Sequence, residues 1–161
     1  MLTQARLKQL LHYDPDTGVF IRTTSTGSTK AGAAVGTAHC KGYYCAMVDY
    51  KKYLLHRLAF LYMTGEWPEH DVDHINGVRT DNRWANLRPA TSAENRQNIR
   101  RAKSNSASGV LGVSWHRGAG KWQAQIKHEG KTRALGLFLN PDDAHAAYLE
   151  AKRSLHTYCT I

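Results

Sequence analysis

The sequence predicts an α+β protein of two units, because two stretches with different patterns flank a basic segment. Residues 1–95 mix helical spacing with short apolar runs, whereas residues 110–156 read as three short strands and then one helix. Between them, residues 96–106 carry four basic side chains and no acidic one. The expected parts are a first domain over residues 1–98, a basic and flexible linker over 99–109, and a second domain over 110–161.

Local signals set the elements of the first domain. Their expected order is a helix over residues 2–11, a turn over 13–18, a strand over 19–21, a weakly paired loop over 23–38, a hairpin over 43–48 and 52–55, and a helix over 56–64. Asp49 and Tyr50 form the expected hairpin turn, and Gly65 is the expected end of the second helix.

The second domain has equally local signals. Its strands are expected over residues 110–117, 121–128 and 132–138, separated by turns at Gly118–Gly120 and Glu129–Gly130. Asn140 is a good N-cap and Pro141 suits the first helical position, so the last helix should begin there. Its apolar stripe must pack on the sheet. We therefore expect a three-stranded antiparallel sheet that packs on one helix.

Net charge narrows the class of partner. The chain has 161 residues, with 22 Lys plus Arg against 13 Asp plus Glu and a net charge of +9. Such a chain attracts polyanions, and phosphate contacts supply most non-specific affinity for nucleic acid. Nucleic acid is therefore the expected partner, although any single basic patch is also explained by a solvated face.

Cysteine use and hydropathy exclude several other classes. Cys40, Cys45 and Cys159 are an odd number without C-x-x-C spacing, which argues against a disulfide framework and a structural zinc site. The sequence has no apolar run of about 18 residues, so no membrane span is expected. Its first residues lack the apolar region of a signal peptide. We expect a cytoplasmic protein, in the host cell if a phage encodes it.

The candidate catalytic residues lie between positions 73 and 95. Asp73 and His74 follow an apolar lead-in, and residues 79–88 then return the chain. Residues 91–94 have the spacing of a capping box, so a helix is expected from Thr91 with Asn95 about one turn inside it. A strand end, a returning loop and a helix could thus bring an acid, an imidazole and amides to one point.

A resemblance to the HNH homing-endonuclease family of phages and mobile introns rests on three motifs in this order: Asp73-His74-x-x-Gly77, Asn82-x-x-x-Asn86-Leu87 and Glu94-Asn95. The resemblance covers roughly residues 13–98, and His56-Arg57-Leu58 is similar to the helix before that family's site. It implies a ββα-metal fold and a metal-dependent DNA endonuclease. Asn95 stands where the family's name has a histidine, which gives the metal an amide ligand.

The residue types suit phosphodiester hydrolysis. His74 can accept a proton from water near neutral pH and is the expected general base. Asp73 and Asn95 offer hard oxygen ligands for one Mg²⁺ or Mn²⁺ ion, with water and DNA oxygens in the other positions. Asn86 is expected to hold the loop and so orient His74. His56 is expected to pack beside the site rather than bind the metal.

Residues 109–156 resemble the DNA-binding domain of the Apetala and ethylene-response-factor type. The matching residues are Gly112-Val113, Lys121-Trp122-Gln123-Ala124, Leu135-Gly136-Leu137-Phe138 and Ala144 to Tyr148. The resemblance implies that the outer face of the sheet reads the major groove. With the basic segment, the expected DNA-binding residues are Arg96, Arg100, Arg101, Lys103, Ser114, His116, Arg117, Lys121, Gln123, Gln125, Lys127 and Arg133. Trp115 and Trp122 are expected in the core.

The first interpretation is therefore a homing-type endonuclease that acts on double-stranded DNA and leaves 5′-phosphate and 3′-hydroxyl ends. A single metal centre per chain favours nicking by a monomer. The alternative is a DNA-binding regulator with an inactive nuclease centre, and a third interpretation is an RNA-binding structural protein. Metal-dependent plasmid cleavage separates the first two, and competition between duplex DNA and RNA tests the third.

Overall fold

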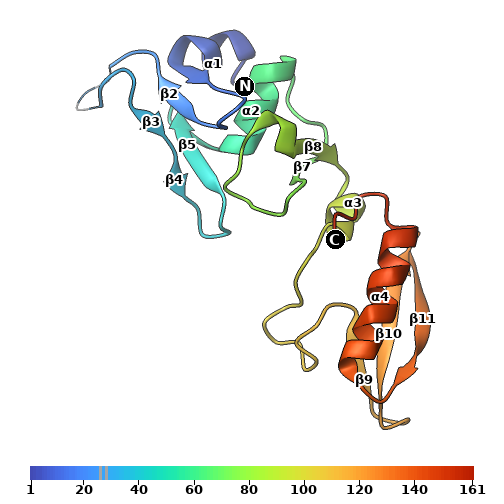
Figure 1. Cartoon of the computed structure of the whole chain (residues 1–161). Coiled ribbons are helices and arrows are strands. Elements are labelled where there is room, and N and C mark those ends of the chain that lie inside the picture. The colour runs from blue at the N-terminus through green and yellow to red at the C-terminus, as the bar shows by residue number, and fades with distance from the viewer. Residues whose placement is uncertain (26, 28) are drawn as a thin grey trace. The chain divides into compact units, whose positions relative to one another are not determined.

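The chain divides into two compact units, Met1–Thr91 and Ser92–Ile161. The structure is a computed structural model, and it describes residues 1–25, 27 and 29–161 (Figure 1). The predicted α+β class is confirmed, since both units combine helices with antiparallel strands. Among the described residues, the helices are too short or too polar for a bilayer span.

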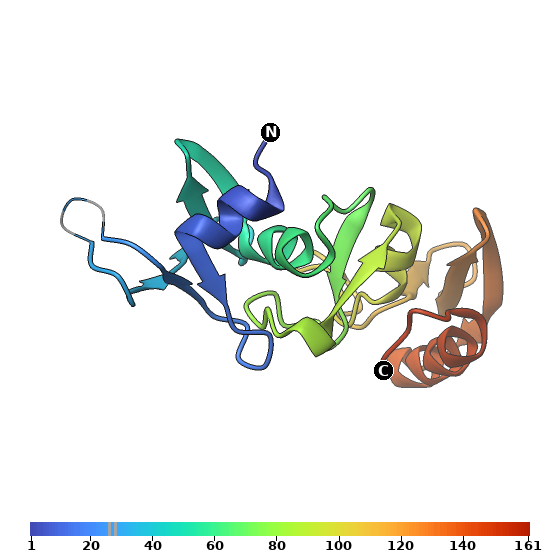
Figure 2. The ribbon, with the colours of Figure 1, turned by 90° about the horizontal axis from the view of Figure 1, so that it is seen from above.

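The first unit builds three small sheets around two helices. Its elements are α1 (Gln4–Leu10), β1 (Leu11–Tyr13), β2 (Phe20–Arg22), β3 (Ala34–Val35), β4 (Thr37–Ala38), β5 (Tyr44–Val48), β6 (Lys51–Leu54), α2 (Leu55–Thr64), β7 (Asp71–His74), the 3-10 turn η1 (Trp84–Asn86) and β8 (Leu87–Ala90). The strands pair in the orders β1-β2-β3, β4-β5-β6 and β7-β8 (Figure 2). The core is centred on residues with almost no exposed surface, including Leu7, Phe20, Leu58 and Leu61.

Local signals fix the ends of these elements. Gly65 ends α2 in the left-handed conformation, with φ of 86°, as the sequence predicts. Asp49 and Tyr50 have φ of 46° and 63°, so the β5–β6 turn has two left-handed residues in succession. The expected loop over residues 23–38 also contains β3 and β4, which pair with β2 and β5. Thr26 and Ser28 of that loop lie outside the described residues.

The second unit packs one long helix on a three-stranded sheet. Its elements are α3 (Ser92–Gln97), β9 (Val113–His116), β10 (Lys121–His128), β11 (Lys131–Phe138) and α4 (Pro141–Leu155). The sheet has the order β11-β10-β9, and Asn140 caps α4 by accepting from the Asp142 amide at 2.9 Å. The small core contains Val113, Ala124 and Ala144. Trp122 packs against it, whereas Trp115 is 46% exposed because it lies on the edge strand β9.

The unit boundary lies before α3, whereas the sequence analysis placed the first domain's end at residue 98. Hydrogen bonds to the C-terminal tail explain the difference, since they join α3 and its following residues to the second unit. The bonds run from the Tyr158 amide to Gln97 Oε1 at 3.3 Å, from Thr160 Oγ1 to Asn98 Oδ1 at 2.6 Å and from Lys152 Nζ to the Ile99 carbonyl. These contacts depend on residues about 60 positions apart, which no local pattern predicts.

A β-bulge changes the face on which Arg133 lies. β10 and β11 shift register between Ala124 and Gln125, and beyond the shift Arg133 pairs with Ile126. Directly paired residues of an antiparallel ladder point to the same face, and Ile126 is buried in the unit. The sequence analysis grouped Arg133 with the outer polar face, whereas the bulge reverses the alternation of side chains and places it on the face of Ile126. Arg133 is still exposed there, and its contact with DNA stays a prediction.

Candidate active site

The site begins on the β7–β8 ribbon, where Asp73 and His74 are consecutive residues of one strand. Asp73 pairs with Arg88 and His74 pairs with Leu87. The two side chains are close enough for the Asp73 charge to act on the His74 ring. Both residues are buried, with exposed fractions of 5% and 4%. Such burial holds both side chains in defined orientations.

Asn86 fastens the loop between the two strands. Its side-chain oxygen accepts from the Asn76 amide at 2.9 Å, and its side-chain nitrogen donates to the Asp81 carbonyl at 2.8 Å. Its own carbonyl accepts from the Ile75 amide at 2.9 Å. One buried side chain therefore ties two points of the loop. The sequence analysis expected Asn86 to orient His74 in this way, and that role stays a prediction.

Asn82 orients the His74 ring. The Nε2 atom of His74 lies 3.2 Å from Asn82 Oδ1, while Asn82 Nδ2 donates to the Thr80 carbonyl at 3.5 Å. An amide oxygen only accepts, so Nε2 carries the hydrogen and Nδ1 is the basic nitrogen of the neutral ring. Burial lowers the pKa of His74, although the bond to Asn82 and the nearby Asp73 partly oppose this. The ring is therefore uncharged, and able to accept a proton, at neutral pH.

Aromatic rings surround the histidine. The His56 ring meets the His74 ring edge-on at 5.1 Å between centroids, and Tyr43 lies 5.0 Å from His56 and 5.9 Å from His74. Arg79 stands over Tyr43 at 5.1 Å and donates to the Lys41 carbonyl at 2.8 Å. Burial lowers the pKa of His56 to about 3. His56 is therefore a neutral packing partner of His74.

Arg88 neutralises the Asp73 carboxylate. Its Nε and Nη2 atoms donate to Asp73 Oδ2 at 3.0 and 2.8 Å, from the directly paired position on β8. A carboxylate is a hard donor that fits Mg²⁺ or Mn²⁺. Among the residues that the structure describes, no cluster of three or more His, Cys, Asp or Glu side chains could hold an ion. An ion bound at Asp73 would therefore take most of its ligands from water and phosphate oxygens.

The predicted catalytic residues divide between the two units. Asp73, His74 and Asn86 lie together on the β7–β8 ribbon and its loop, whereas Asn95 lies on α3 in the second unit. The pairing of Asp73 with Asn95 as metal ligands stays a prediction. The sequence analysis gave no role to Asn82, although it lies inside the quoted motif, and it missed Tyr43, Arg79 and Arg88.

The predicted DNA-binding residues lie in the second unit. Register places Ser114 opposite Gln123 and His116 opposite Lys121, so these four share one face. Gln125 and Lys127 continue that face along β10 and are exposed. Arg117 lies in the exposed β9–β10 turn. The exposed basic residues that precede the sheet are Arg96, Arg100, Arg101 and Lys103.

Comparison with known proteins decides the class of the first site. Residues 53–97 match the family described as HNH endonuclease. These residues are an HNH endonuclease domain. The matched segment includes Asp73, His74, Asn86 and Asn95, and therefore every predicted catalytic position.

Part of this chain is also similar to a phage protein. "Protein 3.8" of Escherichia phage T7 is 38% identical over 60 residues, which are 37% of this chain and 49% of that protein. The chain thus spans about half the length of this curated relative. No solved structure gave a significant match.

Proposed function

We propose that this chain is a metal-dependent DNA endonuclease of the homing type that nicks duplex DNA. The observation that carries the proposal is the buried His74 ring, which Asn82 holds in one tautomer while Asn86 ties the adjoining loop. A hydrolase needs a general base whose proton-accepting nitrogen is fixed before the substrate arrives. The HNH match over residues 53–97 supplies the reaction class.

The residues suggest one sequence of events. Water attacks the scissile phosphorus, His74 Nδ1 takes a proton from that water, and the bond to the 3′ oxygen breaks. The 3′ oxygen takes a proton from solvent water, which leaves 5′-phosphate and 3′-hydroxyl ends. Asn82 keeps the hydrogen on Nε2 throughout and so keeps Nδ1 basic. Asp73, with Asn95 as the predicted second ligand, would hold one Mg²⁺ or Mn²⁺ ion. That ion supplies charge neutralisation at the phosphate.

The second unit would recognise the duplex. Gln123, Gln125 and Lys127 share the outer face of β10 and are the candidates for contacts with base edges. The basic residues 96–103 would follow the phosphate backbone and supply affinity without sequence preference. The three-stranded sheet with an exposed polar face and one helix on its other side supports this division of roles.

Cleavage of supercoiled plasmid tests the proposal. The chain is incubated with plasmid and Mg²⁺ or Mn²⁺, and end mapping reports the strand, the site and the end chemistry. His74→Ala should lower the cleavage rate by about 10²–10⁴-fold with DNA binding kept. His70→Ala is the matched control, because His70 is exposed and contributes only its carbonyl, which accepts from Arg57 at 3.3 Å. Equal rates for His74→Ala and His70→Ala would refute the role of the base.

One observation favours a second candidate function, that of a DNA-binding regulator with an inactive centre. Arg88 already neutralises Asp73, the carboxylate that the metal would use. If this ion pair excludes the metal, the chain would bind duplex DNA without a metal and cut nothing. Adding Mg²⁺ or Mn²⁺ should then change neither the affinity for DNA nor the plasmid, whereas the nuclease requires cleavage that depends on the metal.

A further inference from the structure

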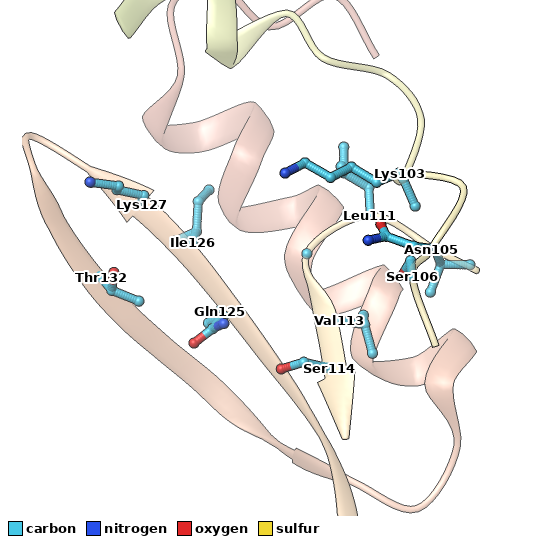
Figure 3. A pocket seen from close by; sticks show the side chains of 13 residues that line it. Lys103, Asn105, Ser106, Leu111, Val113, Ser114, Gln125, Ile126, Lys127 and Thr132 are labelled. Carbon is cyan, nitrogen blue, oxygen red and sulfur yellow. The ribbon is translucent and has the colours of Figure 1, made fainter. Parts of the chain in front are cut away.

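The second unit has a pocket where β10 extends beyond its neighbour. β9 begins at Val113, so its pairing with β10 ends at Ala124, and the later part of β10 has no strand on that side. The segment before β9 lies beside this gap instead, and this segment and β10 line an open pocket of about 620 Å³. Pockets of roughly 300–1,000 Å³ are typical of small-ligand sites. Figure 3 shows Lys127 on the β10 side and Lys103 on the opposite side.

The walls of this pocket are fixed by the fold. Ser108 Oγ donates to the Val113 carbonyl at 2.9 Å, and His145 of α4 contacts the Leu111 carbonyl at 2.9 Å. Gly112 has φ of 76°, and a Cβ there would lie 2.0 Å from the Tyr148 ring, so this segment presses directly on α4. On the other wall, His156 Nε2 lies 3.0 Å from the Lys127 carbonyl. A site with both walls held in this way is formed before any ligand binds.

The lining combines three kinds of chemistry. Lys103 and Lys127 supply two ammonium groups, and none of the described lining residues is acidic. Asn105, Gln125 and Thr132 supply neutral donors and acceptors, and Leu111 adds apolar surface. The two ammonium groups suit a phosphate, and the amides and the hydroxyl can form hydrogen bonds with the edge of a base. The apolar side chain can pack against the face of the base.

We infer that this pocket binds a single nucleotide. The nucleotide is an unpaired or extruded one that belongs to the bound DNA strand. This inference rests on the proposed DNA recognition by the second unit and deepens it. A base stacked inside a duplex cannot enter a recess, so an unpaired nucleotide is the part of a DNA strand that fits. The outer-face residue Gln125 lines the same pocket, which places the recess beside the surface that would hold the duplex.

The test compares a perfect duplex with the same duplex carrying one bulged nucleotide. Fluorescence anisotropy with the full chain, without metal to prevent cleavage, should show at least tenfold tighter binding of the bulged duplex. Asn105→Trp, which fills the pocket without a change of charge, should remove this preference and leave perfect-duplex binding unchanged. The double variant Lys103→Gln/Lys127→Gln should also remove the preference. Lys121→Gln is the matched control: it lies on the same face outside the pocket and should weaken both duplexes equally.

Each outcome decides the inference. A wild-type chain that binds both duplexes equally, or a preference that survives in both pocket variants, overturns it, provided that circular dichroism shows the variants folded. If no duplex binds at all, the proposed DNA recognition fails separately. A fluorescent mononucleotide then decides the pocket: binding to the wild type but not to Asn105→Trp makes free nucleotides the source, and no binding overturns the site.

Discussion

The two units hold their functional side chains in opposite ways. In the first unit, Asp73, His74, Asn82 and Asn86 are each at most 8% exposed, and each has a hydrogen-bond partner within the unit. In the second unit, the candidate contact residues of β10 stand on an exposed face. A buried polar group is costly unless it is satisfied, so the candidate active-site residues also contribute to stability. The candidate DNA-contact residues can change without loss of stability.

The largest effect on folding is expected from Asn86→Ala. This change leaves the Asn76 amide and the Asp81 carbonyl without their partner, and each such loss costs about 1–3 kcal/mol. We expect unfolding in urea to show a loss of about 3 kcal/mol, with cleavage lost as well. Asn86→Asp keeps the acceptor and should cost less. A loss below about 0.5 kcal/mol in Asn86→Ala would show that the loop is held by other contacts.

A pH effect of intermediate size is expected from His56. Its pKa is lowered to about 3 by burial in the folded state, against an ordinary value of 6.5, so the unfolded chain binds the proton first. Stability from neutral His56 is therefore present above pH 6.5 and is lost progressively as the pH falls toward 3.

At 1.36 kcal/mol per pH unit, this loss amounts to about 2 kcal/mol at pH 5. Urea unfolding from pH 7 to pH 4 measures it, and His56→Phe should flatten the dependence. If His56→Phe follows the wild-type curve, another group governs the acid response.

The smallest effect on folding is expected on the outer face of the sheet. Gln125→Ala should change the free energy of unfolding by less than about 0.5 kcal/mol, because the side chain is exposed. The same variant should reduce discrimination between the target and a mismatched duplex by about 1–3 kcal/mol. A destabilisation comparable to that of Asn86→Ala would erase the contrast between the two units.

Sequence patterns identified the structural features that are determined by residues close together in the chain. Gly65 ends α2 and Asn140 caps α4 as predicted, because caps and left-handed ends act within a few residues. The motif positions Asp73 and His74 were found because they are adjacent in the chain. Spacing alone could not reveal that Asn82 reaches the His74 ring, although both lie in quoted motifs.

Contacts between distant segments were not predictable. Tyr43 reaches the site from a loop about 30 residues away from His74, and its type carries no signal of that role. Arg88 would have followed from the register of β7 and β8, but residues 79–88 were expected to form a loop throughout. The position of Arg133 depends on a single bulge, and one extra residue in a strand reverses every side chain beyond it.

The attachment of α3 to the C-terminal tail limits how the protein can be shortened. A fragment of residues 1–98 would retain Asn95 and the whole matched segment, but it would lack Tyr158, which bonds to Gln97. α3 has six residues and no buried side chain, so it cannot stay helical by itself. Such a fragment would carry every motif residue and still present Asn95 on an unfolded end.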